Sequence, residues 1–401
     1  MIGRIARTYC RLWSLSFFRR SEIPRTQRRP WSFLIAFFSL FPLIECFNTL
    51  CLALDHIFFP GHRRANVAAP VFIIGNPRSG TTILHRVLAR DPQFYFFRSW
   101  EIFFPSLLQK RVLRFLGRCD GWLGSPFVKL LAMLERRRFQ KINRLHEISL
   151  FLPEEDDKLF LHILASADNA FMFPYAGFDR YAHFDTDIPR NDQDAAMQFY
   201  TACVRRQAWL HRPTPHLLCK NPAFTGKIEN LRRHFPDARL VYLVRSPLEV
   251  VPSMISLGRN LVQGSFGITP GPDLDETAYG IIKRYYLEAP EKLAAWPHNQ
   301  CITVDYRDLV KRPKETIQNI YDQLGLTLSP EFAAILEEES AKMLAHKSGH
   351  KYSADTTAIA PERIVRELQI IFVRHGFAVP DTLQSSTAAM TQLAEAAAES
   401  A

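Results

Sequence analysis

The sequence predicts an α/β fold in which a parallel sheet is flanked by helices. Short apolar runs that are typical of buried strands occur at residues 71–74, 217–219, 239–244 and 301–304. Segments with helical patterns lie between these runs, and this alternation favours a parallel sheet with helices on both faces. With 401 residues, of which 47% are hydrophobic, the chain is long enough for one large domain with additions.

The helices expected around these strands follow from the spacing of apolar residues and from the turn residues between segments. They are residues 81–88, 107–147, 192–210, 226–234, 248–257 and 314–324. We divide the chain into a basic and apolar N-terminal segment (1–65), a main domain (66–378) and an Ala/Ser-rich tail (379–401). For the tail, a frayed helix or disorder is expected.

Positive charge is concentrated at the N-terminus. The formal net charge is +10, and residues 1–30 contain eight arginines but a single acid, Glu22. The rest of the chain is nearly balanced, so the sequence does not predict a broad basic face for nucleic acid. The seven cysteines are odd in number and form no CxxC pair. This argues against a disulfide framework or structural zinc and favours reduced thiols in a cytoplasmic protein.

Residues 33–54 form an apolar stretch that is about long enough to cross a bilayer. Pro42, Glu45 and Asn48 interrupt it, and a carboxylate near mid-bilayer costs roughly 2.5–3.5 kcal/mol. Three placements are open: a helix or hairpin lying on a membrane surface, a helix docked on the protein core, or a true span. We favour the first, peripheral placement because the arginines of the preceding segment are interleaved with Trp13, Phe17, Phe18 and Trp31. In a true span, the arginines would keep the N-terminus in the cytoplasm.

The strongest local signal is a strand that runs into a glycine-containing loop and then a helix, V71-F-I-I-G-N-P-R-S-G-T-T82. Glycines let the backbone approach an anion closely, and the first N–H groups of the helix then point at a phosphate. An arginine and several hydroxyls add further donors. The candidate anion ligands are Arg78, Ser79, Gly80, Thr81 and Thr82.

The loop resembles a Walker A motif, but Thr81 stands in place of the phosphate-binding lysine. A P-loop kinase also needs a magnesium-binding Asp, whereas the strand RLVYLV is followed by Arg245. Arg245 stands at a strand end, and Ser253 follows about two helical turns later, so the pair is suited to a second phosphate. The sequence therefore predicts a P-loop-like sheet that binds two phosphates without a metal.

PRSGTT after a strand, then K-N-P, then FPDARLVYLVRSPLEVVPS resemble the sulfotransferase superfamily over roughly residues 68–375. The arginine in the first loop is similar to the tyrosylprotein and broad bacterial branches. The resemblance implies 3′-phosphoadenosine 5′-phosphosulfate as co-substrate, no metal, and sulfuryl transfer to a hydroxyl or amine. It assigns the 5′-phosphosulfate to the first loop and the 3′-phosphate to Arg245 and Ser253.

The resemblance also implies catalytic residues. Glu101, a short way after the loop, matches the family's carboxylate base, and Lys220 would stabilise the bridging oxygen, a role that Arg78 could share. Residues 154–157 form an acidic run that is typical of a solvated loop, but in related enzymes such a run lines the acceptor side. Glu155 is therefore the reserve candidate for the base, and His146 is a third option.

Related enzymes close the nucleotide site with a late basic loop, for which His350 and Lys351 are the candidates. Residues 306–309 resemble a family segment that we interpret as the structural start of a helix. The expected acceptor is a small molecule, a lipid or a carbohydrate. Aromatic residues suggest an apolar acceptor, although core packing explains them as well: Phe171, Phe173, Tyr175, Phe178 and Tyr181. The alternatives are a small-molecule kinase and an inactive, membrane-associated nucleotide-binding protein.

Overall fold

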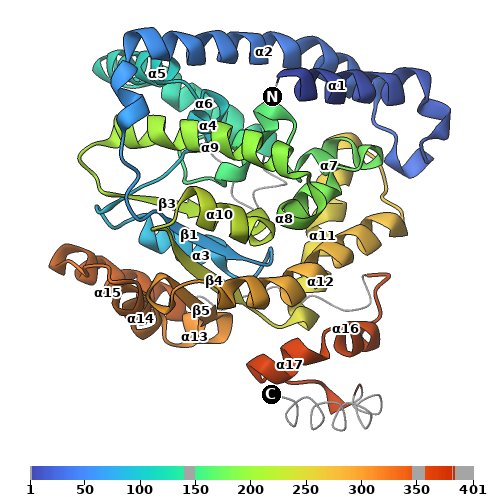
Figure 1. Ribbon diagram of the computed structural model, residues 1–401, viewed down its shortest axis with the longest axis vertical. Helices are drawn as coiled ribbons and strands as arrows, with labels where there is room; N and C mark the ends of the chain where they lie inside the picture. Colours follow the sequence, from blue (N-terminus) through green and yellow to red (C-terminus); the bar gives the residue numbers. More distant parts are fainter. Residues whose placement is uncertain (1, 140–149, 346–356, 382, 384–401) are drawn as a thin grey trace.

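The computed structural model describes residues 2–139, 150–345, 357–381 and 383. A five-stranded parallel sheet lies at its centre, with the strand order β2-β3-β1-β4-β5 (Figure 1). The strands are β1 (Val71–Gly75), β2 (Phe94–Tyr95), β3 (His216–Lys220), β4 (Arg239–Val244) and β5 (Cys301–Asp305). The predicted α/β fold is confirmed. Strand β2 was not predicted, because its two residues carry no readable pattern.

Both faces of the sheet are covered by helices, because successive strand side chains point to opposite sides. Phe72 and Ile74 are buried on one face, and Val71 and Ile73 on the other. The first face packs against α9 (Arg190–His211), α10 (Ile228–His234), α11 (Pro247–Phe266), α12 (Pro272–Ala294), α16 (Pro361–Glu367) and α17 (Gln369–His375). The second packs against α3 (Thr81–Leu88), α13 (Tyr306–Lys311), α14 (Pro313–Leu324) and α15 (Pro330–Ala345).

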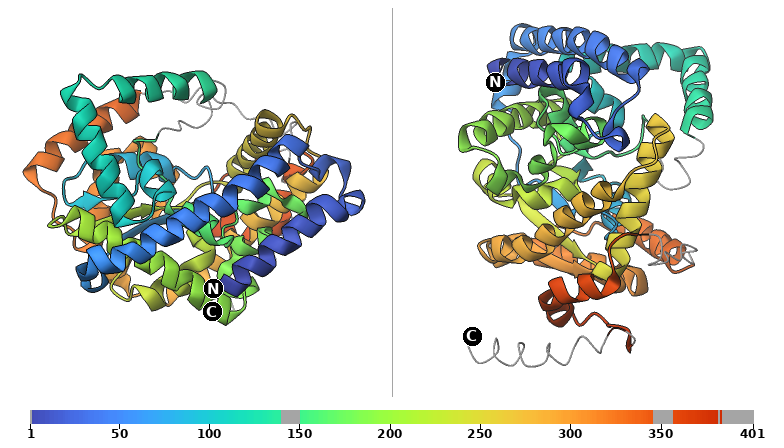
Figure 2. Two further views of the ribbon diagram at one scale, coloured as in Figure 1. Left: turned by 90° about the horizontal axis from the view of Figure 1, so that it is seen from above. Right: turned by 90° about the vertical axis from the view of Figure 1, so that its right-hand side faces the viewer.

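A further group of helices lies beyond the first face, at the opposite end of the molecule from α13–α17 (Figures 1 and 2). These helices are α1 (Ile2–Trp13), α2 (Trp31–Phe58), α5 (Leu107–Trp122) and α6 (Pro126–Phe139). Three short helices complete this part of the chain: α7 (Asn169–Met172), and α4 (Ser99–Phe103) and α8 (Phe184–Asp187), which bury Ile102 and Phe184 in the core of the first face. Leu12 of α1 and Phe38 of α2 are buried against Phe173 and Phe178 in a separate small core. These two aromatic residues are therefore core residues under the N-terminal helices.

Three expected helices differ in the structure. The single helix expected over 107–147 is broken after α5, where Gly124 and Ser125 have φ of 83° and 61°. Residues 140–149 and most of the predicted tail lie outside the described residues. The helix expected from 226 begins only at Ile228, after the 3₁₀ helix η8 (Pro222–Lys227). Helix α12 was missed, and α11 runs past residue 257 to Phe266.

The order of the strands fixes where a ligand can bind. The chain leaves β1 towards β2 on one side of the sheet, and it leaves β4 towards β5 on the other side. Such a reversal opens a crevice at the carboxyl ends of the two strands, which is where open α/β sheets bind ligands. The loop after β1 and the residue after β4 are the two segments that the sequence predicts to bind phosphate.

Candidate active site

The loop between β1 and α3 has a backbone that glycine makes possible. Gly75 has φ of 138°, and a Cβ there would lie 2.3 Å from the carbonyl oxygen of Leu243. A Cβ on Gly80, with φ of 96°, would lie 2.6 Å from the ring of Tyr306. Within the loop, the Ser79 hydroxyl donates to the carbonyl oxygen of Asn76 at 2.6 Å and is buried. The Ser79 hydroxyl therefore stabilises the loop from within, and it is buried instead of being exposed to a bound anion.

The two predicted phosphate-binding motifs are in contact. Arg78 Nε donates to Ser253 Oγ at 3.0 Å, and Arg245 Nη1 donates to the carbonyl oxygen of Arg78 at 3.0 Å. The Arg245 guanidinium also lies over the Tyr306 ring, 4.2 Å from its centroid, and pairs with Glu249 at 2.5 Å. Two arginines and a hydroxyl therefore meet at the crevice between β1 and β4.

Lys220 stands on the other side of β1, at the carboxyl end of β3 and paired in register with Ile73. Its ammonium group is 2.5 Å from a carboxylate oxygen of Glu155, and the residue is only 2% exposed. The 3₁₀ helix η8, which follows β3, is joined to the start of the phosphate loop, because the Gly75 N–H donates a hydrogen bond to the Thr225 hydroxyl at 2.9 Å. Cationic side chains thus lie at three adjacent strand ends.

Glu101 is fully buried at the start of α4, and both of its carboxylate oxygens accept hydrogen bonds. One accepts from the Arg98 N–H at 3.0 Å and Gln207 Nε2 at 2.9 Å, and the other accepts from Arg114 Nη2 at 3.1 Å. Burial acts to raise the pKa of Glu101, but the hydrogen bond with His211 and the charge of Lys110 outweigh it and lower the pKa to about 2. These contacts are those of a carboxylate that caps the start of α4 and anchors Arg114, and they are less suited to a general base.

The acidic run 154–157 is not a solvated loop throughout. Asp156 is buried and accepts a hydrogen bond from the Tyr200 hydroxyl at 2.5 Å. Asp157 is buried and forms an ion pair with Lys227 at 2.7 Å. The side chain of Glu155, by contrast, is 23% exposed and contacts Lys220. Among the four acids, Glu155 is therefore the one whose carboxylate joins the cations at the strand ends.

The family is decided by comparison with known proteins. A family model described as "Sulfotransferase family" matches residues 70–330, which is more than half of the chain. The chain belongs to the sulfotransferase family. It is therefore a sulfotransferase enzyme, and the two alternatives, a small-molecule kinase and an inactive nucleotide-binding protein, are set aside.

Two groups of relatives are similar to this sulfotransferase. The omega-hydroxy-beta-dihydromenaquinone-9 sulfotransferases Stf3 of Mycobacterium bovis and Mycobacterium tuberculosis are 25% identical to it over 303 residues, which is 74% of this chain and 72% of each relative. The crystal structure of STF9 from Mycobacterium avium matches with a TM-score of 0.64 and 18% identity over 82% of both chains. The crystal structure of STF1 from Mycobacterium tuberculosis H37Rv matches with a TM-score of 0.59 and 22% identity, over 80% of this chain and 81% of the STF1 chain. These structures support the fold.

Sequence reasoning missed one residue that contacts the candidate site. Tyr306 was interpreted as the start of a helix, yet its ring contacts Gly80 and the Arg245 guanidinium. Three predicted residues, His146, His350 and Lys351, lie outside the described residues.

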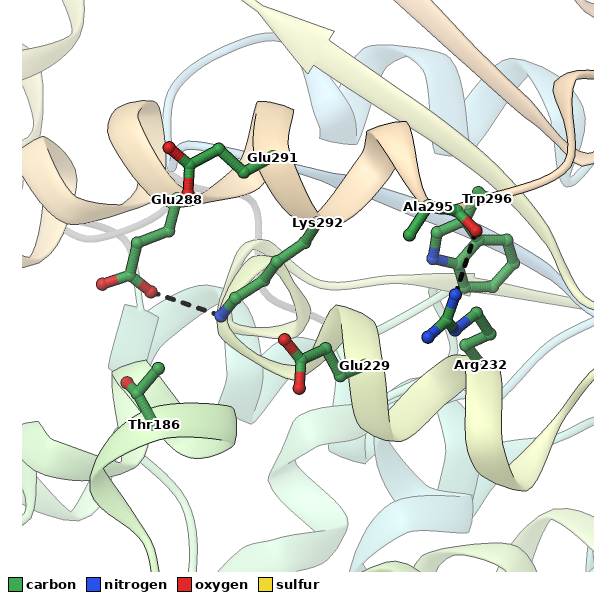
Figure 3. A pocket seen from close by; sticks show the side chains of 8 residues that line it. All are labelled: Thr186, Glu229, Arg232, Glu288, Glu291, Lys292, Ala295 and Trp296. Carbon is green, nitrogen blue, oxygen red and sulfur yellow. Dashed lines mark hydrogen bonds and ion pairs between the residues drawn. The ribbon is translucent and has the colours of Figure 1, made fainter.

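A pocket of about 480 Å³ lies elsewhere, between α10 and α12 (Figure 3). Its lining includes Glu229, Glu288 and Glu291, and Arg232 donates there to the carbonyl oxygen of Ala295 at 2.9 Å. These helices lead into the amino ends of β4 and β5. The pocket is therefore away from the carboxyl ends of the strands, and its carboxylates are unsuited to a phosphorylated nucleotide.

Proposed function

We propose that this sulfotransferase transfers a sulfuryl group from 3′-phosphoadenosine 5′-phosphosulfate to the hydroxyl group of an apolar, lipid-like acceptor. The observation that carries the choice of donor is the contact between Arg78, Ser253 and Arg245 at the crevice. One loop alone would suit many phosphates. Two arginines brought together from two strand ends suit a nucleotide that carries anionic groups at both its 3′ and 5′ positions.

The residues of the crevice divide between the two ends of the donor. The N–H groups at the start of α3, with the hydroxyls of Thr81 and Thr82, would bind the 5′-phosphosulfate. Arg245 and Ser253 would bind the 3′-phosphate. Arg78, which contacts both Ser253 and Arg245, would lie between the 3′-phosphate and the 5′-phosphosulfate. The ring of Tyr306 holds the Arg245 guanidinium in place by a cation–π contact.

The chemistry requires one bond to form while another breaks. The acceptor oxygen bonds to sulfur as the bond between sulfur and the 5′-phosphate oxygen breaks, which releases adenosine 3′,5′-bisphosphate. Lys220 would donate a hydrogen bond to the departing oxygen and stabilise its growing negative charge, and Glu155, which pairs with Lys220, would accept the proton of the acceptor hydroxyl. No covalent enzyme intermediate is needed.

The lipid-like nature of the acceptor rests on two supports. The mycobacterial relatives are named for an omega-hydroxylated menaquinone, an apolar molecule that carries a hydroxyl group. The N-terminal helices of this chain also expose many large apolar side chains. Carbohydrate acceptors offer little apolar surface to bury, so neither support favours them.

The test is transfer of radiolabelled sulfate from the donor into matched extracts. We expect label in hydroxylated isoprenoid or fatty lipids, and little label in carbohydrates or peptides. Incubation with labelled ATP and magnesium serves as the control and should give no transfer. Label confined to the carbohydrate or peptide fraction would contradict the proposed acceptor, and label from ATP would contradict the donor.

The identity of the base is tested by comparing two substitutions. Glu155→Gln is expected to lower kcat by about 10²-fold or more, because a general base contributes 10²–10⁴-fold, while the affinity for adenosine 3′,5′-bisphosphate stays unchanged. Glu101→Gln is expected to lower the melting temperature, since Arg114 loses its ionic partner, and to keep most of the turnover.

Glu154→Gln is the matched control, because Glu154 is adjacent in sequence but pairs with Lys158 at 2.9 Å. It should leave kcat close to that of the wild type. Loss of turnover in Glu101→Gln, at an unchanged melting temperature and unchanged donor affinity, would instead return the role of the base to Glu101.

A further inference from the structure

Helix α2 is oriented with its polar side towards the protein. Three polar side chains of α2 bind partners from the rest of the chain, in the pairs Glu45–His162 (2.8 Å), Asn48–Gln109 (2.7 Å) and Asp55–Arg206 (2.7 Å). Asp55 also accepts the N–H groups of Leu107 and Leu108, both at 2.9 Å, and so caps α5. Two of the three residues that interrupt the apolar stretch in the sequence, Glu45 and Asn48, therefore join Asp55 in fastening α2 to the domain.

The opposite side of α2 is apolar and exposed. Its outward side chains recur at helical spacing and are Leu40, Leu43, Ile44, Phe47, Leu50 and Ile57. Every residue of α2 is described, and none of its exposed side chains is an Asp, Glu, Lys or Arg. The helix has 28 residues and is thus about 42 Å long. In the view from above, α1 and α2 lie in front of the rest of the chain (Figure 2, left). An exposed apolar surface of this length marks an interaction site.

The neighbouring helices α5 and α6 add further exposed apolar side chains and positive charge. Helix α5 packs beside both α2 and α6. The exposed apolar residues of α5, α6 and the turn between them are Phe115, Leu116, Trp122, Leu123, Phe127 and Leu130. Arg111 and Arg118 are exposed at helical spacing from Phe115, so cationic and apolar side chains share one face. Arg7 and Arg11 of α1 are exposed as well. Apolar side chains bordered by arginines match the chemistry of an anionic lipid surface.

We propose that the outward faces of α2, α5 and α6 form a membrane-docking surface that lies flat on an anionic lipid bilayer. Helix α2 is long and apolar enough to cross a bilayer, with a mean hydropathy of 1.8 in its most apolar part. Crossing, however, would pull Glu45, Asn48 and Asp55 from their partners and place two carboxyl groups in hydrocarbon. Lying flat keeps every one of these contacts and covers only the apolar side. The proposal does not depend on the acceptor.

The first experiment is flotation of the full chain with phosphatidylcholine vesicles, with and without phosphatidylglycerol. We expect the wild type to float with the anionic vesicles, and less so in high salt. Leu43→Glu together with Phe47→Glu should reduce the floating fraction by about tenfold or more, because two charges enter the apolar face. Arg111→Glu with Arg118→Glu should remove the preference for anionic lipid.

Val373→Glu is the matched control, because Val373 is an equally exposed apolar residue on α17, at the other end of the molecule (Figure 1). It should float as the wild type does. Cys46, exposed on the outward face of α2, gives a second measurement: its alkylation by a water-soluble maleimide should slow when anionic vesicles are added. A cysteine introduced by Val373→Cys should react at an unchanged rate.

Failure of the wild type to float, or flotation unchanged by Leu43→Glu with Phe47→Glu, would overturn the proposal. So would a dimer in size-exclusion chromatography that this double substitution dissociates, because the surface would then be a contact between two copies of the chain. Sulfate transfer to a detergent-solubilised acceptor is measured separately. Its loss would count against the proposed function and not against the membrane-docking surface.

Discussion

Replacing Lys220 with alanine is expected to lower kcat by about 10²- to 10³-fold, which is the usual effect of removing one hydrogen-bond donor from a developing negative charge. The ammonium group is almost completely buried and is held by Glu155 at 2.5 Å, so its position is fixed by the fold. Because the departing oxygen remains on the 5′-phosphate of adenosine 3′,5′-bisphosphate, the substitution should also weaken the binding of this product, although the proposed contacts of Arg245 and Ser253 with its 3′-phosphate should be kept. Steady-state kinetics and calorimetry measure the two effects separately.

The controls for Lys220→Ala separate chemistry from folding. The substitution leaves Glu155 without its cation, so the melting temperature is recorded alongside the rate. Lys220→Arg keeps the charge and should recover part of the turnover. If Lys220→Ala turned over at a rate close to that of the wild type, the leaving oxygen would have to be stabilised by Arg78 alone.

The parts of the fold that could be predicted are those whose pattern is local. Strand β4 and helix α3 begin and end where the sequence predicts, because each is a run of uniform character bounded by turn residues. Helix α12 was missed, since its 23 residues mix apolar, charged and proline positions without a clear stripe. The break at Gly124 was missed although its signals are local: Gly124 has a positive φ after α5, and Pro126 is the first residue of α6.

The sequence could predict that the two anion-binding motifs of the candidate site lie close together, but not the partners of its carboxylates. Glycines and arginines after strands identify phosphate ligands because the requirement is local. The role of a carboxylate depends on its partners, and the partners of Glu101 include Gln207, more than a hundred positions away. For the same reason Glu45 appears in the sequence as a break in an apolar segment, whereas in the fold it is bound to His162.

Arg78→Ala and Arg245→Ala are each expected to weaken binding of adenosine 3′,5′-bisphosphate by about 10- to 100-fold. Each substitution removes charge-assisted hydrogen bonds worth roughly 1.5–3 kcal/mol, and about 1.4 kcal/mol corresponds to tenfold in affinity. Arg78→Ala has a second effect, because its guanidinium also orients Ser253 through a hydrogen bond of 3.0 Å. Isothermal titration calorimetry with the bisphosphate measures both variants without any acceptor.

Arg307→Ala is the matched control for these two variants. Arg307 follows Tyr306 in the chain, but its guanidinium is bound to Asp305 at 2.7 Å and to the carbonyl oxygens of His375 and Gly376. Its removal should leave the affinity unchanged. Glu249→Gln should strengthen binding slightly, because Glu249 is the carboxylate that competes with a phosphate for Arg245. Unchanged affinity in either Arg78→Ala or Arg245→Ala would mean that the crevice does not hold both ends of one nucleotide.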